Sequence, residues 1–143
     1  MTFFLDANVL IYSAGPSEFR GPCLEILEAV ARGDSSGRTS TAALKEVWYV
    51  ELSGRAGPLE GLTERLYTIL TPVIPVTDEA FRLALRLAAP GLGPDDRLHA
   101  GTCLAHGIDT IVSADRAFDG LREIRRVDPL DERALRRLLG TAG

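Results

Sequence analysis

Four acidic residues are placed where a carboxylate could bind a ligand. Asp6 directly follows the apolar run TFFL, and Asp115 directly follows the apolar run TIVSA. Glu46 lies among apolar residues in TAALKEVWYVEL, and Asp96 lies near the start of PDDRLHAGTCLAHG. Converging carboxylates repel one another, and a divalent cation removes that cost. A site made only of carboxylate oxygens favours Mg²⁺ or Mn²⁺ over zinc, and it suits phosphoryl chemistry.

These acids can meet only if the elements that carry them point to one place. Apolar runs predict short strands over residues 2–5, 73–76 and 110–114, and two further short strands are expected over residues 38–40 and 122–127, the second at an edge of the sheet. Helical spacing and end signals predict helices over residues 17–33, 41–52, 58–70, 77–88, 94–107 and 131–139. This alternation predicts an α/β fold of three layers, α/β/α, with a short central parallel sheet. Ligands gather beyond the carboxyl ends of such strands, where Asp6 and Asp115 would emerge together.

Helix geometry separates the adjacent acids Asp95 and Asp96. Neighbouring helical residues point about 100° apart, so one site cannot easily use both. Asp96 shares its side of the helix with small residues that allow close packing on the sheet, namely Ala100, Cys103 and Gly107. Asp95 shares its side with polar residues, namely His99, Thr102 and His106. We therefore expect Asp96 in the site and Asp95 in solvent, and we interpret the two histidines, seven residues apart, as surface or structural residues.

Each acid also has a purely structural interpretation. Asp6 and Asp115 could cap the turns that follow their strands. Asp96 could complement the positive N-terminus of its helix. Glu46 could be a surface residue of an amphipathic helix, although its apolar neighbours indicate partial burial, which demands a cation or a proton. Glu51, nearer the end of that helix, is more easily solvated.

Composition sets the broad class of the protein. A length of 143 residues, an apolar share of 45% and a charged share of 25% predict a single globular domain over residues 1–143. The net charge of −4 gives no support for nucleic-acid binding, which would need a local basic patch. Fifteen of the sixteen basic residues are arginines, which suits phosphate contacts but also follows from biased genome composition.

The cysteines and the apolar runs bear on location. Cys23 and Cys103 lie far apart, without the spacing of a zinc site or of a disulfide framework. We expect buried thiols and a cytoplasmic protein. The N-terminus lacks the features of a signal peptide, and no apolar run reaches the length of a membrane span, so we expect no membrane contact.

The ordered motifs resemble those of the PIN-domain nucleases. FLDANVLIY resembles the opening motif of that family, and TSTAALKEVWYVEL is similar to the segment that carries its glutamate. DRLHAGTCLAHGIDTIVSADRAFDGL is similar to its closing signature, in which an acid opens a helix and a strand ends in Ser/Thr-x-Asp-x-x-Phe. The resemblance covers nearly the whole chain, and in size and motif style it is greatest to VapC-like toxins of toxin–antitoxin pairs.

The resemblance implies a Mg²⁺- or Mn²⁺-dependent endoribonuclease, the toxin of such a pair. The metal-binding and catalytic acids would be Asp6, Glu46, Asp96 and Asp115. Asn8 and Ser113 would orient acids or water, and Asp119 would assist. The resemblance also implies a homodimer and a small antitoxin protein that fills the active-site groove.

Two arginines directly follow proposed metal-binding acids, and they are candidates for RNA contacts. They are Arg97 and Arg116. The segments DDR and HAG depart from the small residues commoner in the family near Asp96, which places Arg97 either near substrate phosphate or on the surface. Both arginines also fit a plain solvated surface.

Two other functions compete with the ribonuclease. A phosphatase of the HAD-like type would use Asp6 as its nucleophile, but it needs a second aspartate two residues later, where this chain has Asn8. A non-catalytic PIN-like module would bind RNA or protein without cutting, but all four acids are present. Cleavage of RNA with Mn²⁺, compared with the same sample in EDTA, separates these functions.

Overall fold

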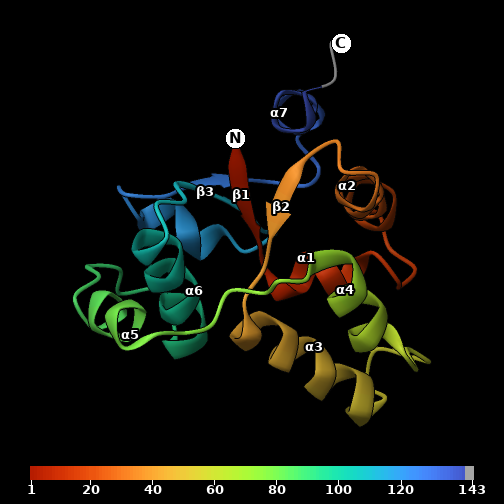
Figure 1. Ribbon diagram of the computed structural model, residues 1–143, viewed down its shortest axis with the longest axis horizontal. Helices are drawn as coiled ribbons and strands as arrows, with labels where there is room; N and C mark the ends of the chain where they lie inside the picture. The colour runs from red at the N-terminus through yellow and green to blue at the C-terminus, as the bar shows by residue number, and fades with distance from the viewer. Residues whose placement is uncertain (141–143) are drawn as a thin grey trace.

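An all-parallel sheet runs through the centre of the computed structural model, which describes residues 1–140 (Figure 1). Residues 141–143, the end of the predicted domain, lie outside the described part. The strands are β1 (Thr2–Leu5), β2 (Ser36–Arg38), β3 (Thr110–Val112) and β4 (Arg125–Val127). Their order in the sheet is β2-β1-β3-β4. The predicted α/β fold with a short parallel sheet is therefore confirmed.

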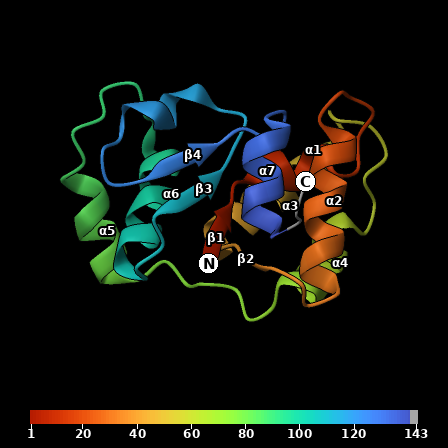
Figure 2. The same cartoon turned by 90° about the horizontal axis from the view of Figure 1, so that it is seen from above.

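Helices cover both faces of this sheet. They are α1 (Ala7–Tyr12), α2 (Arg20–Ala31), α3 (Thr41–Ser53), α4 (Leu62–Leu70), α5 (Asp78–Leu85), α6 (Pro94–Ala105), α7 (Glu132–Leu139) and the short 3-10 helix η1 (Arg116–Gly120). Figures 1 and 2 show α5 and α6 together on one side of the strands, with α2 and α4 on the other. Among the helices described, none is both long enough and apolar enough to cross a membrane.

The first strand organises the core because it pairs on both of its edges. Phe3, Phe4 and Leu5 are fully buried. β1 lies parallel to β2 on one edge and parallel to β3 on the other, with Phe4 opposite Ile111. The predicted adjacency of the first strand and the strand before Asp115 is thus confirmed. Parallel pairing brings the carboxyl ends of β1 and β3 to the same edge of the sheet.

Several predicted boundaries differ from the structure. The strand expected over residues 38–40 lies at Ser36–Arg38, and residues 73–76 form no strand, since only Ile74 bridges to Ser40 there. The helices α1 and η1 were not predicted. Each begins directly after an acid whose side chain caps it. Both helices are too short for the spacing of their apolar residues to indicate a helix.

The start of α4 was predicted four residues too early, at Pro58. Gly61 precedes the helix with a left-handed φ of 81°, which suits glycine. The Glu51 carboxylate accepts hydrogen bonds from the backbone N–H groups of Gly61 and Thr63, both at 2.9 Å. Hydrogen bonds from Thr63 and Gly61 lower the pKa of Glu51, and the residue caps α4 from α3, a contact that was not predicted.

The position of α6 depends on a close approach to α5. A Cβ atom added at Gly101 would meet the carbonyl oxygen of Ala80 and come within 2.9 Å of the backbone nitrogen of Ala84. Only glycine leaves room for the α5 backbone there. This contact helps to set the position of α6, the helix that carries Asp96.

We expect Gly101→Ala to lower the free energy of unfolding by about 1–3 kcal/mol, because α5 must shift to admit the methyl group. Gly21→Ala is the matched control, since Gly21 is an exposed helical glycine whose added Cβ would have no neighbour within 4 Å. Higher helix propensity should make that variant as stable as the wild type or more so. Thermal and urea unfolding measure both, and equal stability of the two variants would contradict the packing argument.

Candidate active site

Asp6 is the central acid of the site. It follows β1 at the carboxyl edge of the sheet and is only 3% exposed. Its Oδ1 accepts from the backbone N–H of Ala7 at 2.7 Å, so Asp6 also caps α1. The capping role and the site role therefore coexist in one carboxylate.

Asn8 and Ser113 hold the second oxygen of Asp6. Oδ2 accepts from Ser113 Oγ at 2.6 Å and from Asn8 Nδ2 at 3.1 Å. The Asn8 amide also donates to Ser113 Oγ at 3.2 Å and accepts from the backbone N–H of Ala114 at 3.3 Å. These bonds join the end of β1 to the end of β3. Both residues predicted to orient an acid thus contact the Asp6 carboxylate.

Asp115 stands two residues beyond Ser113. Its backbone N–H donates to Ser113 Oγ at 3.0 Å, and its Oδ1 accepts from the backbone N–H of Ala117 at 2.9 Å, which caps η1. Its backbone is therefore fixed to the same hydroxyl group that binds Asp6. One serine positions two of the acids.

Glu46 reaches the site from α3 by way of a histidine. His99 of α6 is fully buried, with Nε2 3.0 Å from Glu46 Oε2 and 3.6 Å from Asp6 Oδ1. Each of these three residues offers one atom that could bind a metal ion, and the three atoms lie within 4.8 Å of one another. Burial lowers the pKa of His99, but the hydrogen bond to Glu46 and the charges of the nearby acids outweigh it, so the pKa is raised.

Asp96 completes the acidic group from the first turn of α6. Burial, the charge of Asp6, and a hydrogen bond with Asp115 raise the pKa of Asp96 to about 7. Asp96 thus interacts with acids at the ends of both β1 and β3. Asp95 is exposed, as helix geometry predicted.

The expected polar, solvent-facing stripe of α6 is largely wrong. His99 and Thr102 are fully buried, whereas His106 is exposed. His99 is the site residue that the sequence reasoning missed. Its separation of three residues from Asp96 was an available signal, because residues three apart share a helix side. The separation of seven between His99 and His106 carries no such signal, because His106 is exposed.

The arginines predicted to contact RNA differ in their surroundings. The Arg97 guanidinium donates to the backbone carbonyls of Leu87, Ala89 and Leu92 at 2.7–2.9 Å, so it fixes the segment between α5 and α6. Arg116 is exposed at the start of η1. The exposed position of Arg116 fits both an RNA contact and a plain surface residue, whereas the three carbonyl contacts of Arg97 give it an intrachain role.

Asp119, predicted to assist the four acids, is paired with an arginine. Its two oxygens accept from Arg126 at 2.8 and 3.2 Å, which lowers the pKa of Asp119. Arg126 also donates to the carbonyl oxygen of Ser113 at 2.9 Å. Asp119 thus supports the turn that carries Asp115.

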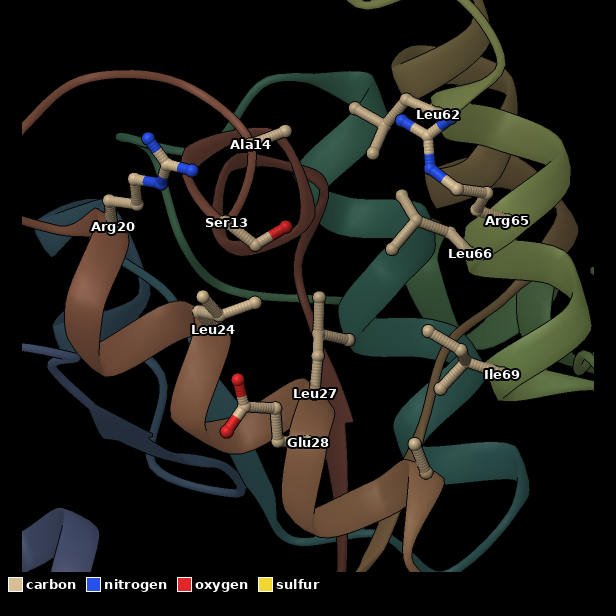
Figure 3. Close-up of a pocket in the computed structure, with 11 residues that line it drawn as sticks. Ser13, Ala14, Arg20, Leu24, Leu27, Glu28, Leu62, Arg65, Leu66 and Ile69 are labelled. Atoms are coloured by element: carbon tan, nitrogen blue, oxygen red, sulfur yellow. The ribbon is translucent and has the colours of Figure 1, made fainter.

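A separate apolar pocket lies between α2 and α4 (Figure 3). It has a volume of about 380 Å³. Leucines from both helices line it, together with Arg20, Glu28 and Arg65. None of the four acids lines this pocket. The acidic group and the apolar pocket are therefore different surfaces of the protein.

Comparison with known proteins gives this arrangement a family. A model of the PIN domain matches residues 3–124. The chain belongs to the PIN-domain family. It is 30% identical to Ribonuclease VapC7 of Mycobacterium tuberculosis over 145 residues, which cover 95% of this chain and 97% of that protein.

Solved structures with this PIN fold come from protein complexes. FitAcB from Neisseria gonorrhoeae has a TM-score of 0.72 and 15% identity, covering 90% of this chain and 99% of that chain. VapBC2 from Rickettsia felis, bound to a DNA fragment from its promoter, has a TM-score of 0.69 and 18% identity, covering 90% and 98%. At these identities the likeness establishes the shared three-layer fold.

The residues at the carboxyl edge fit the divalent ion that PIN-domain nucleases use. The carboxylates of Asp6 and Glu46 are close enough to share one ion. Asp96 interacts with both Asp6 and Asp115. Such oxygens are the ligands of hard divalent cations. Burial and, after it, the charge of Asp6 raise the pKa of Asp96, and a cation beside these acids would offset the part due to charge.

The metal-free protein should lose stability as the pH rises, and Asp96 should be one cause. A carboxyl group with a higher pKa in the folded chain favours folding when protonated, so that stability is lost between pH 3.8 and about 7. We expect Asp96→Asn to raise the melting temperature at pH 8 by the equivalent of about 1–2 kcal/mol, allowing for partial exposure, and to change it little at pH 4.

Melting scans in EDTA across this pH range test the expectation. Asp95→Asn is the control, because Asp95 is exposed and should give the same small change at every pH. In added Mn²⁺ the melting temperature of the wild type should rise more than that of Asp96→Asn, so that the wild type becomes the more stable of the two. A pH-independent gain in Asp96→Asn would contradict the assigned cause.

Proposed function

We propose that this protein is a Mg²⁺- or Mn²⁺-dependent endoribonuclease that acts as the toxin of a toxin–antitoxin pair. The observation that supports the proposal is the proximity of Asp6 and Glu46 at the carboxyl edge of the sheet, with Asp96 close enough to Asp6 and Asp115 to interact with both. Membership in the PIN-domain family and the similarity to a VapC ribonuclease support the same reaction.

Each side chain has a distinct task in this proposal. Asp6, Glu46, Asp96 and Asp115 hold the cation. When bound, the cation supplies positive charge to the attacked phosphate and lowers the pKa of an attacking water. Asn8 and Ser113 keep the Asp6 carboxylate turned toward the other acids, since both donate to its Oδ2.

The same contacts weigh against a HAD-like phosphatase. That chemistry requires Asp6 as a free nucleophile and an acid two residues later. Here the two Asp6 oxygens accept from Ala7, Asn8 and Ser113, and the residue two positions later is the Asn8 amide. A nucleophilic role for Asp6 is therefore poorly supported.

We further propose a small antitoxin protein as the partner. Structural neighbours of this chain are solved as VapBC and FitAB-type complexes, some of them on DNA. A homodimer is a second part of the proposal, on the strength of the family resemblance. Co-expression with the protein encoded beside this gene, followed by size-exclusion chromatography with light scattering, measures both assemblies.

The purified protein should cleave single-stranded RNA in Mn²⁺ or Mg²⁺ and should lose this activity in EDTA. Asp96→Asn should reduce cleavage by at least about 100-fold, because one acid of the metal site is lost. Asp95→Asn should retain most of it, since Asp95 is exposed. A gel assay on labelled RNA measures all three.

Two results would contradict this proposal, the first in its assignment of Asp96 and the second in its function. Equal loss in both aspartate variants would show that the assigned helix side is wrong. RNA binding without cleavage in any divalent metal, by a folded wild-type protein, would favour the non-catalytic PIN-like module instead.

Arg116 should provide part of the RNA affinity of this acidic protein. In the inactive Asp96→Asn background, Arg116→Ala should weaken binding across RNA sequences and lower the salt slope by about 0.7, which corresponds to one lost phosphate contact. Arg122→Ala is the control. Arg122 lines a pocket with Met1, which precedes β1, so it lies near the opposite end of that strand from Asp6. Arg97→Ala should act mainly on stability, through its three carbonyl contacts. Fluorescence anisotropy at several salt concentrations measures the RNA affinity of each variant. Identical salt slopes for Arg116→Ala and Arg122→Ala would show that Arg116 does not contact RNA.

A further inference from the structure

We propose that His99 is a positioning residue that holds the Glu46 carboxylate against Asp6 by donating a hydrogen bond from Nε2, and that it is not itself a metal ligand. This inference rests on the proposed metal-dependent function and adds to it a fifth side chain of a different type. The four acids alone do not explain how Glu46, on α3, is kept beside an acid on another element.

The geometry places the imidazole between the two carboxylates. Nε2 lies 3.0 Å from Glu46 Oε2, a hydrogen-bond distance, and 3.6 Å from Asp6 Oδ1. His99 is fully buried, and its ring lies 5.6 Å from that of Phe4 in β1. Packing on a strand residue fixes the ring, so the direction of Nε2 is fixed as well.

The other ring nitrogen decides between donor and ligand. Nδ1 is buried, and among residues 1–140 it has no hydrogen-bond partner. A histidine that binds a metal through Nε2 carries its proton on Nδ1, and this N–H almost always donates to a neighbouring acceptor. Here such a proton would be buried without an acceptor, which is costly.

A proton on Nε2 satisfies the surroundings better. It points at Glu46 and lies near Asp6, so it offsets part of the repulsion between these two carboxylates. This holds for the neutral ring with its proton on Nε2, which leaves no proton on the buried Nδ1. This hydrogen bond engages Glu46 through Oε2 alone, so the other Glu46 oxygen stays available for a cation.

Nitrogen spectra of the metal-free protein test the hydrogen bond directly. Long-range ¹H–¹⁵N correlations of labelled wild-type protein should show a proton on His99 Nε2, and Glu46→Gln should shift that resonance. A neutral ring with its proton on Nδ1 would overturn the proposal, as would an Nε2 resonance that ignores Glu46→Gln.

Bound Mn²⁺ gives the second test. Pulsed electron paramagnetic resonance of the wild-type protein with Mn²⁺ should show no directly coordinated nitrogen, and a strong nitrogen coupling that disappears in His99→Gln would identify His99 as a ligand instead. His99→Leu should weaken Mn²⁺ binding by about 10–100-fold, as is typical when a residue that orients a ligand is lost.

His99→Gln should keep most of that affinity, because its amide places a donor near the position of Nε2. Equal losses in His99→Leu and His99→Gln, with both variants folded, would reduce His99 to a packing residue and overturn the proposal. If the wild type binds no Mn²⁺, the metal-dependent function fails on its own, while the nitrogen spectra still decide the hydrogen bond. If His99→Leu does not fold, the wild-type spectra and His99→Gln remain decisive.

Discussion

The burial of the Asp6 carboxylate is the constraint on which the rest of the site depends. At 3% exposure its oxygens have lost nearly all contact with water and need donors from the protein. Those donors come from Ala7 and Asn8 on α1 and from Ser113 beyond β3. Asp6 has all of these donors only when β1 and β3 are adjacent and in register. Correct pairing of the two strands therefore also assembles this part of the site.

Burial and the charge of neighbouring acids raise the pKa of Asp96. Asp6 is satisfied by three donors, whereas Asp96 is half-buried beside Asp6 and Asp115, and it holds its proton up to a pH of about 7. In the metal-free protein, a proton on Asp96 and the His99 N–H facing Glu46 each remove part of the repulsion. A divalent cation would compete with that proton, so metal binding is expected to strengthen as the pH rises toward 8.

The sequence predicted those parts of the fold that rest on local signals. TFFL and TIVSA are apolar runs followed by acids, and the alternation of strands and helices predicts that they are parallel; the structure shows that they are adjacent. Thr77 as a cap and Pro94 in the first turn placed α5 and α6. The convergence of the acids could be anticipated because the carboxyl ends of parallel strands share one edge. Long-range effects could not be read in this way: the start of α4 is set by Glu51, ten residues before Gly61, and His99 is explained only by Glu46 on another helix.

Helix α6 shows how precision at this edge arises from contacts that each have a local reason. Gly101 lets the backbone of α5 approach, Arg97 fixes the carbonyls of the segment between the two helices, and His99 meets Glu46 on α3. The three contacts are made with α5, with the segment before α6 and with α3, so together they restrain the position of α6. Asp96 lies within the same two turns, and its distance from Asp6 is fixed by neighbours that are not acids. A metal site built on repelling charges requires this arrangement, because the acids would move apart if nothing else held their helices.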